Sequence, residues 1–420
     1  MTSTLASIVA GGLLAVIATA QTPQYTITDL GAVGADGQPF QITTNGLGAG
    51  AAMAGSALHA TMWYQGKTYD LGTLTGQNSQ AFGANVFVQP GYGPGAVVGE
   101  AQTSKPDPDG EDFCSLTALG LPPSGTCLPF LWVSGVMYAL PTLGGNNGIA
   151  NKINYANEVA GTAENTIYDA TCPSGFVQHQ SKPVIWHYAI ANQLPTYPGD
   201  PDGSAMAIND AGVAAGASGT CAPSSMISAI NLQPLHALLW QNGTATDLGN
   251  LGGTGQFFGI EAEFLNNSGQ VVGWSDTKGD TNFHAFLWTK GTGMQDLGTV
   301  GTDVNSLAIG INDNGVVVGA SLDVNFNPRA FVSVGQSLVD LNTLIPAGSP
   351  LYLFTACNIN DAGQITGIAL DQSGNVHAYV ATPNPTEIGV SSPELTPAVD
   401  AASAPRPQLP RFRLGGKIRN

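Results

Sequence analysis

Charged side chains are scarce in this chain of 420 residues, in which Asp, Glu, Lys and Arg together make up 10%. Basic residues are rarer still, with 12 Lys and Arg against 29 Asp and Glu and a net charge of −17. Such an acidic body repels nucleic acid and anionic membranes, which argues against both as partners. The chain also lacks G-x-S-x-G, H-E-x-x-H, P-loop and C-x-x-C motifs, so no common catalytic signature is available to assign a reaction.

Long apolar runs are almost absent too. The exception covers residues 5–20 and ends in Ala18-Thr19-Ala20, an A-x-A cleavage pattern before Gln21. It is too short and too rich in glycine for a membrane span, which needs about 20 apolar residues. Although no Lys or Arg precedes it, we expect residues 1–20 to be a signal peptide. With no second such run, we predict an extracellular protein without an integral membrane anchor.

Glycine and apolar residues are what the chain has in quantity. It contains 55 Gly, 27 Pro and 43% apolar residues, a composition typical of an all-β chain with many short strands. A repeated unit confirms regular architecture, as in HAFLW from His284, DLG from Asp296 and INDNGVVVGAS from Ile311. The Asn-Asp-x-Gly element predicts a tight turn between two strands. The Trp that ends the first segment recurs at 63, 132, 186, 240 and 288, and its place is then taken by Ser333 and Ala381.

Each unit holds four short strand-like segments, which is the content of one propeller blade. The chain ends its repeats with a first segment at His377 and begins them with a second segment at Tyr25. Joining the two termini gives one composite blade beside six internal ones. We therefore predict an all-β, seven-bladed β-propeller of four-stranded blades over residues 21–382, closed by its terminal strands. The small residues of VVGAS suggest that this strand lies nearest the axis, with the HAFLW strand further out, although the reverse order is also open.

Five cysteines fit an exported protein. Cys114 and Cys127 bracket one loop, and we expect them to pair. Cys172 and Cys221 follow equivalent segments of neighbouring units and are expected to bridge them. Cys357 occupies a repeat strand, where we expect a buried thiol.

The segments HATMW, HALLW, HAFLW and HAYV, with DLG and INDNGVVVGAS, resemble the HAF repeat of secreted bacterial proteins. The resemblance covers residues 25–382 and weakens where Leu128-Pro129 and Lys182-Pro183 replace the opening His-Ala. It implies export and a repeat fold. It supplies no catalytic residue.

Histidine and acidic residues offer two candidate metal sites. Four histidines (His59, His236, His284 and His377) share one repeat position, which indicates a structural role, with a metal ring as the alternative. The loops DPDGED from Asp107 and GDPDG from Gly199 alternate carboxylates around a glycine, a pattern that calcium favours. Solvated turns are the competing interpretation. No cofactor is otherwise expected.

Departures from the repeat locate the candidate function. Residues 100–128 and 165–183 are insertions rich in acidic and aromatic side chains, and loops on a rigid scaffold commonly carry recognition. We predict a monomeric extracellular binding or scaffolding module whose ligand is a glycan or another cell-surface component. The alternative is a carbohydrate-active hydrolase or lyase with carboxylates in the axial cleft or loops. Residues 383–420 are expected to form a flexible Pro- and Ala-rich tail with a basic end. The candidate binding residues are Asp107, Asp109, Glu111, Asp112, Phe113, Tyr168 and Phe176.

Overall fold

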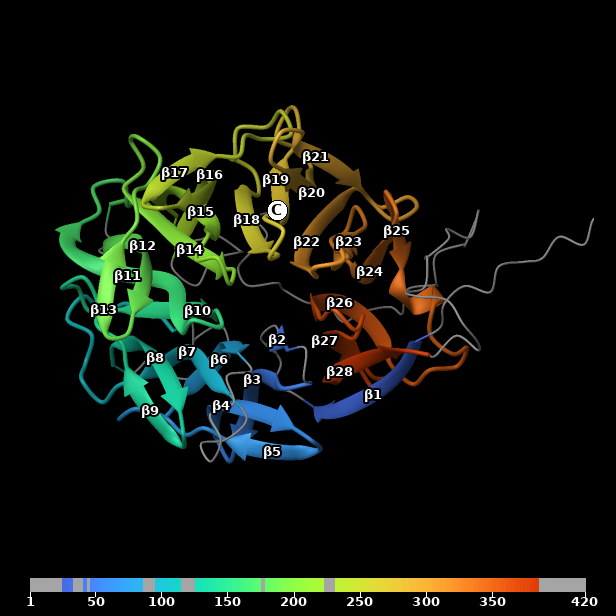
Figure 1. Cartoon of the computed structure of the whole chain (residues 1–420), viewed down its shortest axis with the longest axis horizontal. Coiled ribbons are helices and arrows are strands. Elements are labelled where there is room, and N and C mark those ends of the chain that lie inside the picture. Colours follow the sequence, from blue (N-terminus) through green and yellow to red (C-terminus); the bar gives the residue numbers. More distant parts are fainter. Residues whose placement is uncertain are drawn as a thin grey trace, which may run out of the picture.

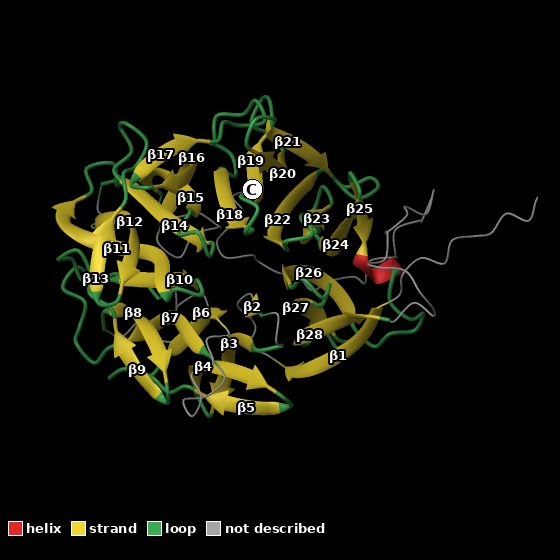
Figure 2. Cartoon of the chain, viewed as in Figure 1, coloured by secondary structure: helices red, strands yellow, loops and turns green. Residues whose placement is uncertain are grey.

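Seven antiparallel sheets of four strands each form a closed ring (Figures 1 and 2). The computed structural model describes residues 25–32, 41–43, 46–85, 95–114, 125–174, 178–222 and 231–384. These residues form the predicted seven-bladed all-β propeller. Across the same residues, helix is limited to the short η1 (Leu341–Thr343), and no helix has the length and apolarity needed to cross a bilayer. The predicted signal peptide, Phe176 and residues 385–420 lie outside the described ranges.

The blades follow one another along the chain, and each is built from strands consecutive in sequence except the seventh. Blade one comprises β2 (Gln41–Ile42), β3 (Gly48–Ala54), β4 (Ala57–Tyr64) and β5 (Lys67–Asp70). Blade two comprises β6 (Ser79–Asn85), β7 (Ala96–Gln102), β8 (Cys127–Val133) and β9 (Val136–Ala139). Blade three comprises β10 (Gly148–Ile153), β11 (Glu158–Tyr168), β12 (His179–His187) and β13 (Ile190–Gln193). Blade four comprises β14 (Asp202–Ile208), β15 (Ala214–Cys221), β16 (Leu232–Gln241) and β17 (Thr244–Asp247).

The remaining blades complete the ring. Blade five comprises β18 (Ile260–Leu265), β19 (Val271–Asp276), β20 (Phe283–Thr289) and β21 (Gly293–Gly298). Blade six comprises β22 (Asn305–Ile311), β23 (Val317–Leu322), β24 (Pro328–Val334) and β25 (Ser337–Asp340). Blade seven comprises β26 (Tyr352–Ile359), β27 (Ile365–Leu370), β28 (Val376–Pro383) and the N-terminal β1 (Tyr25–Ala32).

The terminal strands close the ring as the sequence predicts. β1 pairs antiparallel with β28, from Tyr25 opposite Pro383 to Ala32 opposite His377. The two strands lie side by side in Figure 1. The composite blade takes only this one strand from the N-terminus, because residues 41–54 begin blade one. The sequence repeat therefore begins two strands into each blade, since its first segment is the third strand of the sheet.

The radial order differs from the sequence expectation. The innermost strands are β2, β6, β10, β14, β18, β22 and β26, which converge on the axis in Figure 1 and contact one another around the ring. The Val-Val-Gly strand lies second from the axis. Its glycine is needed for a close approach within the sheet, since a Cβ on Gly319 would lie 2.0 Å from the Leu307 carbonyl oxygen. The small residues thus reflect crowding between neighbouring strands rather than crowding at the axis.

A chain of asparagine side chains joins the blades. The amide of Asn312, for example, donates to the Asn360 carbonyl of the next blade at 3.0 Å, while its Oδ1 accepts from the Val316 N–H at 2.9 Å. The asparagines are buried, so each side-chain amide needs a partner, which it finds in a backbone carbonyl of the next blade. The last donor, Asn360, bonds the Thr43 carbonyl and so joins blade seven to blade one. The donors in chain order are Asn85, Asn154, Asn209, Asn266, Asn312 and Asn360.

Tryptophans add a second connection between blades. Trp240 is 1% exposed, and its indole N–H donates to the Pro195 carbonyl of blade three at 2.7 Å. Trp186 bonds Pro141 of blade two in the same way at 2.8 Å. The prolines that follow β9 and β13 therefore supply acceptors for the following blade.

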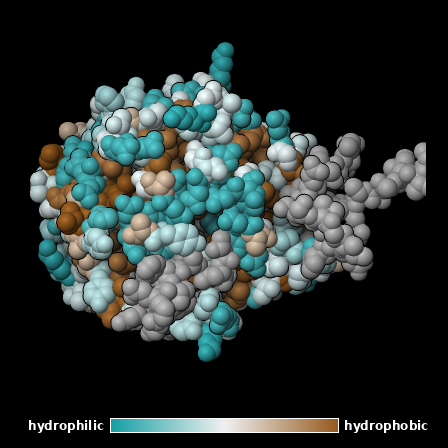
Figure 3. All heavy atoms as spheres, in the orientation of Figure 1, coloured by the Kyte–Doolittle hydropathy of each residue, from teal (hydrophilic) through white to brown (hydrophobic). Residues whose placement is uncertain are grey.

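Hydrophilic residues gather over the middle of the face seen in Figure 3, where the innermost strands meet.

Candidate functional site

Two disulfides anchor the inserted loops. Cys114 is bonded to Cys127 and Cys172 to Cys221, while Cys357 is a buried thiol, as the sequence predicts. The first bond ties the end of segment 103–114 to the start of β8. The second joins blade three to blade four. Two disulfides indicate that the protein folds in an oxidising compartment.

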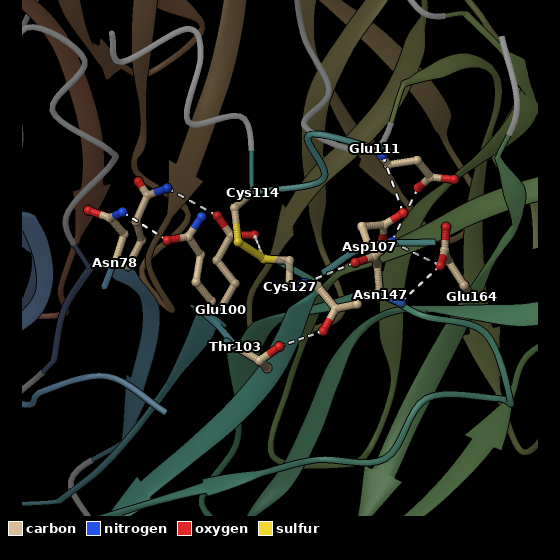
Figure 4. Close-up of a disulfide and its surroundings, with 12 residues drawn as sticks. Asn78, Glu100, Thr103, Asp107, Glu111, Cys114, Cys127, Asn147 and Glu164 are labelled. Atoms are coloured by element: carbon tan, nitrogen blue, oxygen red, sulfur yellow. Dashed lines mark hydrogen bonds between the residues drawn. A yellow bond between two sulfur atoms is a disulfide. The ribbon is translucent and has the colours of Figure 1, made fainter. Parts of the chain in front are cut away.

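Segment 103–114 places its carboxylates against blade three. Oδ1 of Asp107 accepts from the backbone N–H groups of Asp109 and Glu111, at 2.8 and 3.3 Å, so the acidic pattern forms its own turn. The turn is held by Asn147, whose Nδ2 donates to Oδ2 of Asp107 at 2.9 Å and to Oε2 of Glu111 at 3.2 Å. Figure 4 shows these carboxylates converging on Asn147 beside the disulfide.

Glu164 on β11 is the third carboxylate at Asn147. It is fully buried, and its Oε2 accepts from the backbone N–H groups of Asn146 and Asn147 and from the Asn147 side chain. In blade two the counterparts of Asn147 and Glu164 are Asn78 and Gln102. That pair carries no charge, and Asn78 donates to Oε1 of Gln102 at 2.8 Å. Oε1 of Glu164 has no hydrogen-bond donor among the described residues, and neither has Oε1 of Glu111.

Asp109 connects this cluster to an aromatic pair at its edge. Its Oδ1 accepts from the Tyr168 hydroxyl at 3.1 Å, and its Oδ2 accepts from Nδ2 of Asn146 at 3.1 Å. Nδ1 of His179 lies 3.4 Å from the same Oδ2. The Tyr168 and His179 rings stack with centroids 4.3 Å apart, and Tyr168 is 57% exposed. We call Asp107, Asp109, Glu111, Glu164 and His179 the acidic cluster.

The electrostatics of the acidic cluster disfavour full ionisation. Burial raises the pKa of Glu111 to about 10, and the charge of Glu164, a hydrogen bond between the two carboxyl groups, and the charges of Asp107 and Asp109 raise it further. Burial also raises the pKa of Glu164, although hydrogen bonds and the nearby His179 partly oppose the shift. Like charges in a largely buried site must bind a proton or another cation.

Three side chains of the cluster suit a metal ion. The ligand atoms of Asp109, Glu111 and His179 all lie within 4.8 Å of one another. Two further acidic groups contain cysteine pairs, Cys114 with Cys127 and Cys172 with Cys221. Those thiols are oxidised to disulfides, so neither pair can supply thiolate ligands.

The structure brings together four of the residues proposed for binding, namely Asp107, Asp109, Glu111 and Tyr168. Phe113 is 3% exposed and packs in a core cluster with Cys114 and Cys127, which corrects the expectation that its ring is exposed for recognition. Asp112 is half-buried, and its charge raises the pKa of Glu100 rather than joining the cluster. Phe176 lies outside the described residues.

The second acidic loop has a structural role. Asp200 accepts from Ser218 at 2.6 Å and from His236 at 2.8 Å. Asp202 is buried and accepts from the Ser181 N–H, and burial together with the neighbouring Asp169 raises its pKa to about 9. Neither belongs to a group of metal-ligand side chains within the described residues.

The repeated histidines each bond a carboxylate close by rather than one another. His59 bonds Asp70 and His284 bonds Asp296, each at 2.9 Å, and His377 of β28 bonds Asp29 of β1 at the same distance. These carboxylates also accept the N–H of the glycine two residues on, as Asp70 does from Gly72. The structural interpretation of the repeat position therefore holds, and the described contacts give no metal ring.

Sequence reasoning missed Glu164, His179 and an axial pair. His179 was detectable, since it lies in the 165–183 insertion away from the repeat histidine position. Lys152 of β10 donates to the Phe82 carbonyl of β6 at 3.2 Å and lies 5.0 Å from the Phe264 ring of β18, so it spans the axis. Its charge interacts with Glu263, whose pKa burial raises to about 7. Only the ring geometry brings these inner strands together.

Comparisons with known proteins give no assignment. No family model matches the chain, and no curated protein does. Among solved structures, a puromycin-hydrolyzing peptidase of Mycobacterium tuberculosis matches at 10% identity with a TM-score of 0.47, covering 85% of this chain and 56% of that one. Dipeptidyl peptidase 4 of Porphyromonas gingivalis matches at 11% identity with a TM-score of 0.36, covering 80% and 51%. The chain thus spans little more than half the length of either.

Proposed function

We propose that this protein is a secreted binding module that presents segments 103–114 and 165–180 to an extracellular glycan or other cell-surface component. The observation that supports the proposal is the exposed Tyr168 ring held over a disulfide-anchored group of carboxylates. An aromatic face stacks on the apolar face of a sugar ring, and carboxylates accept bonds from its hydroxyl groups.

Export is part of the same proposal. The two disulfides, the apolar run ending at Ala20 and the resemblance to HAF-repeat secreted proteins all support it. Amino-terminal sequencing of material from the culture medium is expected to begin at or near Gln21. Intact Met1 in protein recovered from the cytoplasm would contradict export.

A binding screen tests the site. Purified protein is applied to an array of glycans and cell-wall polysaccharides, and the ligand found is titrated against Tyr168→Ala. We expect the affinity to fall by about tenfold or more, the usual cost of losing a central aromatic contact. Tyr188→Ala is the matched control, since Tyr188 is 79% exposed but lies at the β12–β13 turn. Equal affinities for the two variants would remove the site from segments 103–114 and 165–180.

A carbohydrate-active enzyme is the second candidate, supported by Glu263 beside Lys152 at the axis. Glycoside hydrolysis needs a carboxylic acid that is still protonated near neutral pH, and Glu263 has a raised pKa. Glu263→Gln tests this role on polysaccharide digests. Loss of turnover in that variant, with Tyr168→Ala unaffected, would favour the enzyme over the binding module.

A further inference from the structure

We propose that Asp109, Glu111 and His179 bind a divalent transition-metal ion, for which Zn²⁺ is the best-matched common example. Their ligand atoms lie within 4.8 Å of one another, close enough for one ion with bonds of about 2 Å to reach all three after small side-chain movements. The side chains of Asp109 and His179 are 10% and 12% exposed, which places the site just below the surface. This site stands whether or not the same loops bind a glycan.

Glu164 supplies a second indication of a missing cation. It is fully buried, its carboxyl group lies against that of Glu111, and its Oε1 has no N–H donor within the described part of the chain. Asp276 is the equivalent residue of blade five, sixth in VVGWSD as Glu164 is sixth in VAGTAE. Both oxygens of Asp276 accept backbone N–H groups, from Phe257, Phe258 and Gly259. The longer Glu164 side chain satisfies the N–H groups of Asn146 and Asn147 with Oε2 alone, and its carboxyl group also meets that of Glu111.

His179 is also bound less closely to its carboxylate than the structural histidines are to theirs. The four repeat histidines lie 2.8 to 2.9 Å from their carboxylates, whereas Nδ1 of His179 lies 3.4 Å from Asp109 and makes no hydrogen bond to any described residue. Blade four holds a close counterpart, in which His236 stacks on Tyr197 and bonds Asp200 at 2.8 Å. That counterpart lacks the additional glutamates, and its histidine and carboxylate satisfy each other.

The donor set selects the class of ion. Imidazole nitrogen suits zinc and its neighbours in the transition series, whereas calcium takes six to eight oxygen ligands. Two carboxylates and one imidazole match a zinc site that keeps a position open to solvent or ligand. The neighbouring Cys114 and Cys127 do not compete, because they are joined to each other.

Calorimetric titration of the full chain tests the site. The protein is prepared without a histidine tag, stripped with chelator and titrated separately with Zn²⁺, Mn²⁺ and Ca²⁺. We expect one Zn²⁺ per chain, bound more tightly than Ca²⁺. Glu111→Gln and His179→Gln should each weaken zinc binding by about 100-fold or more, since loss of a ligand costs at least as much as loss of its supporting contacts. His236→Gln is the control and should leave zinc affinity unchanged.

Thermal denaturation of each variant, measured without metal, shows whether it is folded. Zn²⁺ should raise the melting temperature of the wild type and of His236→Gln, but not of Glu111→Gln. The proposal is overturned if the folded wild type binds no stoichiometric zinc, if Ca²⁺ binds and Zn²⁺ does not, or if His236→Gln loses zinc as fully as His179→Gln. Absence of zinc together with a more stable Glu111→Gln variant would show that Glu111 and Glu164 share a proton instead.

Discussion

Asn312 shows how one side chain can join two blades. Replacing it with Ala removes its bond to the Asn360 carbonyl and leaves the Val316 N–H without its partner, so we expect the free energy of unfolding to fall by about 1–3 kcal/mol. Asn314 in the same turn also bonds blade seven, but at an exposed position, and Asn314→Ala should cost no more than about 0.5 kcal/mol. Denaturant unfolding measures both. Equal losses would show that burial of the asparagine bond does not matter.

Glu100 makes stability depend on pH. It is 1% exposed, and its pKa rises from 4.5 to about 8 because of burial and the nearby Asp112, against a bond from Gln80. Between these values the folded state holds a proton that the unfolded state has lost, so stability decreases as pH rises through this window, by up to about 1.4 kcal/mol per pH unit. Glu100→Gln removes the titration and should gain stability relative to the wild type from about pH 5 to pH 8. Parallel pH profiles of the two proteins would refute this assignment.

The sequence predicts individual residues when the repeat explains them. The strand-start histidines play the expected structural role because each copy meets the same local surroundings. Phe113 is misjudged because its burial depends on a core cluster that includes Ala217 and Leu232 of blade four, far away in the chain. Glu164 is missed because its place in a strand gives no sign of the loop that folds over it.

Segment 103–114 depends on its disulfide to hold the acidic turn against blade three. Replacing both Cys114 and Cys127 with Ala should lower the free energy of unfolding by about 3 kcal/mol for a loop of this size, with a sequence separation of 13. Zinc affinity should fall as well, because Asp109 and Glu111 lie in the segment that the bond secures. Cys357→Ala removes a buried thiol elsewhere and should leave zinc affinity intact. Unchanged zinc affinity in the double variant would mean that Asn147 alone positions the segment.

Strand order within a blade is only partly readable from the sequence. The four segments, their turns and the outer position of the HAFLW strand relative to the glycine strand follow from the pattern. The innermost position does not, because the small residues of the Val-Val-Gly strand fit crowding at the axis as well as crowding within the sheet. What separates them is the close contact at Gly319, which becomes visible only when the β22 and β23 backbones are paired.

Ring closure was the strongest inference available from the chain, since an incomplete unit at each end leaves one consistent arrangement. Deleting residues 376–383 removes β28, which leaves β1 without its partner and exposes the edge of β27. We expect a loss of more than about 5 kcal/mol, comparable with the total stability of many domains. Truncation after Asn384 is the control, because it leaves all seven sheets complete. Identical melting temperatures for the deletion and the control truncation would contradict closure through β1 and β28.

The closed ring also explains why the sequence alone does not predict the residue contacts at the axis and between the loops. Lys152 and Phe264 are separated by more than 100 residues, yet they meet because blades three and five face the same axis. His179 meets Asp109 because blade three receives the loop of blade two. Sequence marks the insertions, but only the closed ring decides which of their side chains converge.

Anomalous diffraction shows whether the acidic cluster holds a cation. Crystals of the wild-type protein grown with Zn²⁺ are measured above and below the zinc absorption edge. We expect one strong anomalous peak at bonding distance, about 2.0–2.2 Å, from Asp109, Glu111 and His179. An ordered cluster with no peak between these side chains, or a peak held by His236 instead, would contradict it.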